Sequence, residues 1–341
     1  MSSNKININD LKTEGAEDGQ TLRWLDGCAQ WADSAGAPIL FSFGGLSDGF
    51  LGGGKCGTTT LNVIDKFPFA SHVGVAYAGV AMSYLDTGRI WLSRGVSDTD
   101  NCNGYMVGGN PTINWVQKFS YNTEGNATCV GTLSGCATVE GVQTQATRGY
   151  GYSSGGFPGP PGQRTIGFIQ KFPFAVDENA TCIGSLALSS AAGSGNSSST
   201  HGYAAGGDFD IGDFHSWIQK FPFATEENAV CIGNLTVSCE NWSSQSSTTA
   251  GYASGVSYGA PSSSSLINKF SFANDENATC IGDLTFSPSP SYCLIAAGIS
   301  STVGGYAALG SIDCFPFASD TNATCVGNVN KPRCGSSGHQ G

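Results

Sequence analysis

The chain has 341 residues, of which 49 are glycine and only 12% are charged, and its formal net charge is −11. This composition fits many short strands joined by tight turns, and it fits long helices poorly. The 15 lysines and arginines form no cluster, which argues against nucleic acid as a partner. The sequence contains no run of about 18 apolar residues, so no membrane insertion is predicted.

The first segment, residues 1–36, is expected to be an arm that carries a short hairpin. Its start is polar and lacks the apolar core of a secretory signal peptide. Further on, Leu22, Trp24 and Trp31 alternate around Asp26-Gly27, which predicts a β-hairpin. This hairpin either supplies a strand that closes the last repeat or attaches the chain to another protein, and the pattern is compatible with both roles.

Residues 37–334 consist of six copies of one unit of about 50 residues. The most regular phrase is Lys-Phe-Pro-Phe-Ala or a close variant, and its copies begin at Lys66, Lys118, Lys171, Lys220, Lys269 and Cys314. Each copy is preceded by an aromatic residue that glycine follows three or four positions later, beginning at Phe41, Tyr105, Tyr152, Tyr203, Tyr252 and Tyr306. Five copies are followed by Asn-Ala-Thr-Cys-Val/Ile-Gly or a close variant, beginning at Asn126, Asn179, Asn228, Asn277 and Asn322.

Each unit is expected to form an antiparallel sheet of three or four strands. In residues 217–223, a period of two places Gln219, Phe221 and Phe223 on one face together with Trp217. The two phenylalanines would then fill a core between neighbouring sheets. A further strand is expected in the Ser/Gly-rich stretch before the next Gly-Tyr, such as residues 193–200.

A unit of this length and strand content has the size of a β-propeller blade. We therefore predict an all-β fold with a single propeller of six blades, followed by a flexible tail at residues 335–341. Seven blades would result if residues 1–38 or 71–103 contained a degenerate blade. The alternative is a β-solenoid or an open array of the same units, for which 50 residues per step is long.

The Asn-Ala-Thr-Cys phrase carries two candidate modification sites. Its cysteines indicate either hairpin-spanning disulfides or buried reduced thiols. The candidate pairs are Cys129 with Cys136, Cys231 with Cys239, Cys280 with Cys293, and Cys325 with Cys334. Most Asn-x-Ser/Thr sequences are interpreted as turn chemistry, or as glycan acceptors if the chain is made by a system with its own glycosylation route.

No constellation of catalytic, cofactor-binding or metal-binding residues is recognised in the sequence. The four histidines fall at different repeat positions, and the recurring carboxylates indicate turns or a solvated rim rather than an acid/base pair. We therefore expect a non-enzymatic protein without a cofactor. Loops of varying length on a rigid scaffold commonly carry recognition, and Phe209, Phe214 and Trp217 in one such loop are candidates for stacking on sugars. Trp217 is equally consistent with a core position.

Residues 39 to about 334 resemble kelch repeats, although Phe-Pro-Phe replaces the usual kelch spacing of Tyr and Trp. The phrases Lys-Phe-Pro-Phe-Ala and Asn-Ala-Thr-Cys-Val/Ile-Gly are similar to repeats of marine phages and other large environmental viruses, where Asp often replaces the Cys. Residues 18–34 resemble an element of phage tail-fibre proteins. These resemblances imply a virion structural or adhesion protein, at the virion surface or tail, that contacts other virion proteins or a host-surface glycan. The alternative is a cellular or secreted lectin-like propeller that binds carbohydrate, and a propeller enzyme is a less favoured third interpretation.

Overall fold

The computed structural model contains two compact units, residues Met1–Phe41 and Ser42–Gly341. It describes residues 20–25, 28–33, 47–56, 59–70, 76–80, 92–110, 113–123, 125–134, 139–159, 164–210, 213–238, 240, 242–255, 265–285 and 296–341. In the first unit, β1 (Gln20–Leu25) pairs antiparallel with β2 (Cys28–Asp33), with Leu25 opposite Cys28. The hairpin predicted for this segment is therefore present.

The described part of the second unit contains six four-stranded antiparallel sheets. The first sheet combines both ends of the unit, as β28 (Ser337–Gln340), β3 (Asp48–Gly52), β6 (Val63–Pro68) and β7 (Ala76–Val80). The second and third sheets are β8 (Arg94–Asp98), β9 (Asn103–Val107), β10 (Trp115–Ser120) and β11 (Thr128–Thr132), then β12 (Gln143–Ala146), β13 (Tyr150–Ser154), β14 (Phe168–Pro173) and β15 (Thr181–Ser185).

The remaining three sheets repeat the same strand order. The fourth is β16 (Ser194–Ser197), β17 (His201–Asp210), β18 (Asp213–Pro222) and β19 (Val230–Asn234). The fifth and sixth are β20 (Ser243–Ser246), β21 (Ala250–Ser254), β22 (Leu266–Ser271) and β23 (Thr279–Asp283), then β24 (Ala297–Ser300), β25 (Gly304–Ala308), β26 (Ser311–Pro316) and β27 (Thr324–Asn328). A small ribbon of β4 (Lys55–Cys56) and β5 (Thr59–Thr60) lies between β3 and β6.

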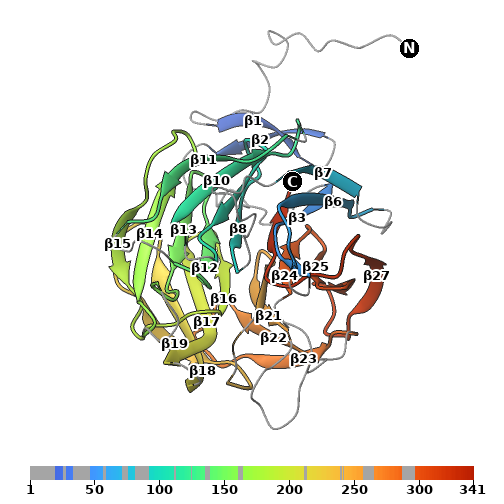
Figure 1. Cartoon of the computed structure of the whole chain (residues 1–341). Helices are drawn as coiled ribbons and strands as arrows, with labels where there is room; N and C mark the ends of the chain where they lie inside the picture. Colours follow the sequence, from blue (N-terminus) through green and yellow to red (C-terminus); the bar gives the residue numbers. More distant parts are fainter. Residues whose placement is uncertain are drawn as a thin grey trace, which may run out of the picture. The chain divides into compact units, whose positions relative to one another are not determined.

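The first strands of neighbouring sheets contact one another in a closed ring, in the order β8, β12, β16, β20, β24, β28 and back to β8. The last strands, such as β15, β19, β23 and β27, lie at the periphery (Figure 1). Radial sheets around a common axis define a six-bladed β-propeller. The predicted all-β, six-bladed fold is therefore confirmed, and β16 occupies the strand position expected in residues 193–200.

The ring is closed by the C-terminal strand, which corrects two predictions. Residues 335–341 are not a flexible tail, because β28 pairs with β3 from Ser337 opposite Gly52 to Gln340 opposite Gly49. The strand that closes the ring is β28 and not the N-terminal hairpin. The sixth blade is already complete without β28, and a buried ion pair between Arg333 and Asp65 of β6 also joins the segment before β28 to the first blade.

Stacked aromatic rings form the core between blades. The aromatic residue of the second strand in each blade stacks on the second aromatic residue of the Phe-Pro-Phe phrase in the next blade, with centroids 4.5–4.9 Å apart. The pairs are Phe50–Tyr121, Tyr105–Phe174, Tyr152–Phe223, Tyr203–Phe272, Tyr252–Phe317 and Tyr306–Phe69. The predicted placement of the Phe-X-Phe pair between sheets is confirmed. In the first blade, Phe50 performs the role that the sequence pattern assigned to Phe41, which lies outside the described residues.

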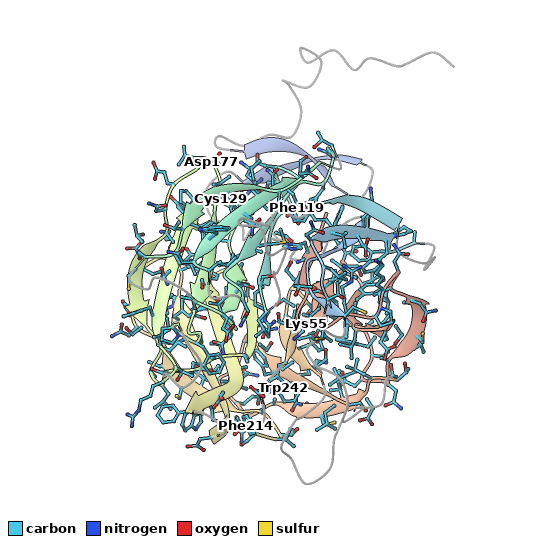
Figure 2. All side chains as sticks on the ribbon, in the orientation of Figure 1. Lys55, Phe119, Cys129, Asp177, Phe214 and Trp242 are labelled. Carbon is cyan, nitrogen blue, oxygen red and sulfur yellow. The ribbon has the colours of Figure 1, made fainter. Side chains whose placement is uncertain are left out.

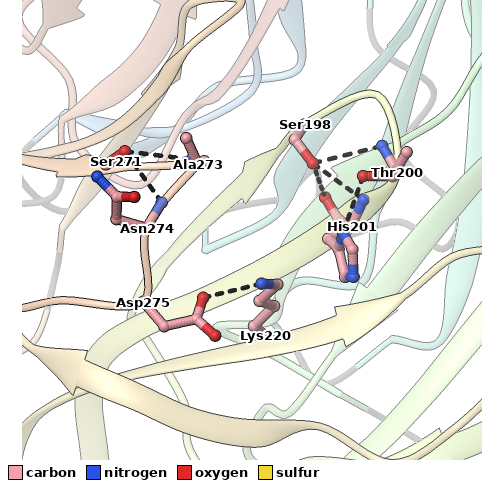
Figure 3. Close-up of polar contacts among 8 residues, drawn as sticks. All are labelled: Ser198, Thr200, His201, Lys220, Ser271, Ala273, Asn274 and Asp275. Carbon is pink, nitrogen blue, oxygen red and sulfur yellow. Dashed lines mark hydrogen bonds and ion pairs between the residues drawn. The ribbon is translucent and has the colours of Figure 1, made fainter. Parts of the chain in front are cut away.

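Ion pairs at the rim join four of the same blade pairs. The lysine of the Lys-Phe-Pro-Phe phrase reaches an acidic residue of the next blade, with N–O distances of 2.8–3.3 Å, in the pairs Lys118–Asp177, Lys171–Glu226, Lys220–Asp275 and Lys269–Asp320. Figure 3 shows the pair formed by Lys220 and Asp275. The recurring carboxylates therefore serve the contact between blades.

The two faces of the propeller differ in how their connections are built. On one face, which we call the turn face, short turns join the first and second strands, and in the last three blades a serine caps the turn. In the fourth blade, the hydroxyl of Ser198 accepts the N–H groups of Thr200 and His201 (Figure 3). Ser247 and Ser301 cap the equivalent turns. On the opposite face, the loop face, the connection between the second and third strands ranges from two residues in the sixth blade to the segment 155–167 in the third. Sequence variation between blades is therefore concentrated on the loop face.

Candidate functional site

The hairpin of β17 and β18 is the most distinctive described feature of the loop face. Both strands have 10 residues, whereas the equivalent strands β13 and β14 have 5 and 6. Two bulges interrupt the pairing, between Ala205 and Gly207 and between Asp208 and Asp210. The extended part of the hairpin is anchored to neighbouring connections, because Asp208 pairs with Ala191 of the preceding connection and the Thr165 hydroxyl donates to the carbonyl oxygen of Phe209 at 2.5 Å.

An aromatic cluster lies on one face of this hairpin. Phe209 is 37% exposed and meets Trp217 edge-to-face, with ring centroids 6.0 Å apart. His215 stacks on Trp217 at 4.5 Å. Phe214 precedes His215 by one residue, so it points to the opposite face of β18, and Figure 2 labels it at the periphery. Of the three predicted aromatics, the structure brings Phe209 and Trp217 together and separates Phe214 from them.

His215 belongs to this cluster and was missed in the sequence analysis. It lies two residues from Trp217, so the period of two along a strand was the signal that could have revealed it. Its side chain is 5% exposed, and neither ring nitrogen has a hydrogen-bond partner among the described residues. Burial lowers its pKa to about 4, so the imidazole is neutral at pH 7. A neutral stacked ring with this pKa is a poor general base at neutral pH, and it extends the flat surface that Trp217 and Phe209 form.

A small pocket lies at the propeller axis, at the ends where the inner strands begin. Its polar lining comes from Arg94, Thr144 and three serines, and the rest is lined by Trp242, two alanines and the glycines Gly95, Gly298 and Gly338. A Cβ at Gly95 would overlap the carbonyl oxygen of Gly338, so the inner strands approach one another as closely as backbones allow. This close approach leaves only a small pocket, which is compatible with a water molecule or an ion.

The described cysteines do not form the predicted disulfides. Cys129, Cys231, Cys280 and Cys325 are exposed free thiols, as is Cys182. Cys325 lies on the outer strand β27, whereas Cys334 is buried beside the backbone of Lys55, so this candidate pair is not formed. The other proposed partners, Cys136, Cys239 and Cys293, lie outside the described residues.

The asparagines of the repeated Asn-Ala phrase act as brackets between blades. Oδ1 of Asn179 accepts the N–H of Thr132 at 2.9 Å, and the N–H of Ala180 donates to the carbonyl oxygen of the same Thr132. Asn228, Asn277 and Asn322 repeat this arrangement on the next outer strands. The phrase therefore protects the last residue of the preceding blade's outer strand, where the edge would otherwise be free to pair with another strand. Asn196, another Asn-x-Ser/Thr residue, is buried and donates to the backbone of the fifth blade.

No group of three or more His, Cys, Asp or Glu side chains in the described part of the chain is arranged to hold a metal ion. Within the same residues, no helix has the length and apolar character needed to cross a membrane.

Comparison with known proteins places the chain by its fold. No family model and no curated protein sequence matches it. Solved structures do match, among them one described as "Structure of YjhT", with a TM-score of 0.59 and 10% sequence identity over 73% of this chain and 87% of that chain. At this identity the similarity shows the fold alone. The class that the blades and this comparison define is the six-bladed β-propeller.

Proposed function

We propose that the chain is a non-enzymatic binding module, a virion structural or adhesion protein whose loop face contacts a host-surface glycan or another virion protein. The observation that carries the proposal is the difference between the two faces. Similar capped turns recur on the turn face, whereas on the loop face the connection between the second and third strands ranges from two residues in the fourth and sixth blades to the segment 155–167 in the third. Selection for recognition acts on such variable loops, while the rest of the scaffold stays constant.

The cluster of Phe209, His215 and Trp217 favours a sugar as the contacted group. An exposed phenyl ring beside a half-buried indole offers the flat apolar surface on which the C–H face of a pyranose stacks. The imidazole adds no charge at neutral pH because its pKa is lowered to about 4. The viral assignment rests on the kelch-like repeats of marine-phage type and on the tail-fibre-like segment of residues 18–34, for which attachment to the particle is the role that we propose.

Two measurements test the proposal. Mass spectrometry of purified virus particles is expected to detect the chain, and its absence from them would contradict the virion assignment. Glycan-array binding by the isolated chain without virion association would favour the second candidate, a cellular or secreted lectin-like propeller. The aromatic cluster supports this second candidate equally well.

The binding face is tested with two exposed aromatic residues. Phe209→Ala is expected to weaken glycan binding at least tenfold, which corresponds to about 1.4 kcal/mol. Tyr150→Ala is the matched control, because Tyr150 is 42% exposed but begins β13 next to a turn-face connection. Equal losses in both variants, or no loss in Phe209→Ala, would rule out the hairpin as the contact surface.

A further inference from the structure

Five of the described cysteines occupy the same position on the outer rim of the propeller. Each is the second residue of an outermost strand, and all are exposed: Cys129 on β11, Cys182 on β15, Cys231 on β19, Cys280 on β23 and Cys325 on β27. In four of them the thiol donates to the carbonyl oxygen of the glycine two residues further on, at 3.5–3.7 Å. These strands lie at the periphery in Figure 1, and Figure 2 labels Cys129.

Packing does not explain these cysteines. Cysteine is among the most frequently buried residue types, and an exposed free thiol gains nothing from burial. The first blade has Tyr77 at the equivalent position of β7, as its pairing with Asp65 shows, so the fold does not require a thiol there. The Asn-Ala brackets bond to the last residue of β11, β15, β19 and β23, and the cysteine lies three residues earlier on each of these strands, so its side chain stays accessible.

Geometry prevents these five thiols from pairing with one another within one chain. Neighbouring cysteines lie on the outer strands of different blades, and packed sheets are about 10 Å apart. A disulfide needs a Cα–Cα distance below about 7 Å. Cys182 has no other cysteine close to it in sequence, and Cys334, the sequence neighbour of Cys325, is buried. Cys325 has a nearer neighbour in Cys314, which lies opposite Thr324 on the adjacent strand. Among the described residues, Cys182 has no such neighbour on its paired strand, so oxidation of Cys182 joins this chain to another molecule.

We propose that the rim cysteines link copies of this chain edge to edge through intermolecular disulfides. A second copy fits this role because it presents the same exposed strand position, and five positions allow each copy to bind more than one neighbour. The linkage goes beyond the proposed glycan contact and is independent of it. In the chemical step, a rim thiolate attacks a disulfide oxidant such as oxidised glutathione, and the rim thiol of a second copy displaces the remaining glutathione. One new disulfide forms, and two glutathione thiols are released for each pair of rim thiols.

The experiment measures covalent assembly of the full chain. Reduced protein is incubated with oxidised glutathione at pH 8 and analysed on non-reducing gels, with mass spectrometry of the linked peptides. Wild type is expected to form dimers and larger species joined through rim cysteines. Because each copy carries a net charge of −11, added salt is expected to speed the linkage by screening the repulsion between copies.

Variants test the number and position of the links. Replacing all five rim cysteines by serine is expected to abolish the ladder of dimers and larger species on the gel and to leave the circular-dichroism spectrum unchanged. Retaining Cys182 alone among the five should allow dimers only, and retaining Cys182 with Cys325 should restore larger species. The control Cys314→Ser, a half-buried cysteine of β26, should leave the ladder intact. A ladder that persists in the five-serine variant, or wild type that acquires glutathione without chain-to-chain links, would overturn the proposal.

Discussion

The residue before each blade's inner aromatic side chain is glycine because a Cβ atom there would have no room. At Gly202, a Cβ would overlap the Cζ of Phe221, the first phenylalanine of the phrase in the same blade. That ring is fully buried between two blades and has no room to move aside. The Gly-Tyr pair is therefore a single device, in which the glycine admits one ring and the tyrosine stacks on another.

The substitution Gly202→Ala is expected to reduce the free energy of unfolding by about 1–3 kcal/mol, the usual cost of overpacking. Gly149→Ala is the control, because a Cβ there would meet nothing within 4 Å. It should be neutral or slightly stabilising, since alanine restricts the unfolded chain. Chemical denaturation of both variants measures the difference, and equal stabilities would contradict this account of the glycine.

His339 makes closure of the ring sensitive to acid. It is fully buried on β28, where one ring nitrogen lies 2.9 Å from the Ser337 hydroxyl and the other 3.3 Å from the carbonyl oxygen of Val96. Burial lowers its pKa from 6.5 to about 4. Between these values the unfolded chain binds a proton that the folded chain does not, so stability is lost as the pH falls from about 6.5 towards 4.

The inner strands of the third and fifth blades have glutamine, Gln145 and Gln245, at the position of His339. His339→Gln should therefore fold, and its melting temperature should fall less than that of wild type between pH 7 and pH 4.5. Part of the dependence of the melting temperature on pH should remain in this variant, because burial also lowers the pKa of His215. Thermal melts across this pH range provide the measurement, and parallel curves for the two proteins would refute the role of His339.

At the scale of the blade, two kinds of contact join neighbouring sheets, and their magnitudes differ. Between the fourth and fifth blades, Tyr203 stacks on Phe272 at 4.8 Å, and Lys220 pairs with Asp275 at 2.8 Å. Tyr203 is 1% exposed, whereas more than half of the Asp275 side chain remains in solvent. Water screens the ion pair but not the ring stack, so the aromatic contact dominates.

Tyr203→Ala is accordingly expected to cost about 3–5 kcal/mol of unfolding free energy, as for other buried aromatic residues. Lys220→Met should cost less than about 1 kcal/mol, and its effect should shrink further in high salt. Urea denaturation at low and high salt separates the two contributions. A larger loss of unfolding free energy in Lys220→Met than in Tyr203→Ala would show that the ion pair, and not the aromatic stack, dominates the contact between blades.

Repetition made the blade predictable from sequence. The Phe-Pro-Phe phrase alternates clearly, and its six copies gave the number of sheets. The inner strands carry no such pattern, because Ser-Gly-His-Gln at β28 is neither apolar nor alternating. Its likeness to Ser-Gly-Asn-Ser at β16 was the available signal that residues 335–341 were a strand and not a tail.

The site was only partly predictable for a related reason. Phe209 and Trp217 stood out by type, but their contact depends on bulges in β17 and β18 that no residue pattern announces. The cysteine pairs were inferred from proximity along the chain. Strand register instead directs Cys129 and its equivalents outwards, and burial places Cys334 away from Cys325.

For the whole propeller, β28 is the element on which the ring depends. Without it, β3 would have an unpaired edge, and the contacts that β28 makes with β24 and β8 would be lost. Deleting residues 335–341 is expected to abolish cooperative unfolding and to cause aggregation. Deleting residues 1–41, the separate first unit, should leave the melting temperature unchanged.

Scanning calorimetry and light scattering distinguish these two deletions. Adding a peptide of residues 335–341 to the shortened chain should restore part of the transition, because the peptide can pair with the open edge of β3 and its binding stabilises the closed ring. A soluble shortened chain that melts like wild type would show that the ring is stable without its last strand.

Residues 47 and 341 lie next to each other, so the ring of blades does not depend on the position of the chain break between them. The carbonyl oxygen of Gly341 accepts the N–H of Ser47 at 3.1 Å, so a short linker would join these two residues. New ends could then be opened in residues 186–193, between β15 and β16. In such a circular permutant, each of the six sheets would come from one uninterrupted stretch of sequence.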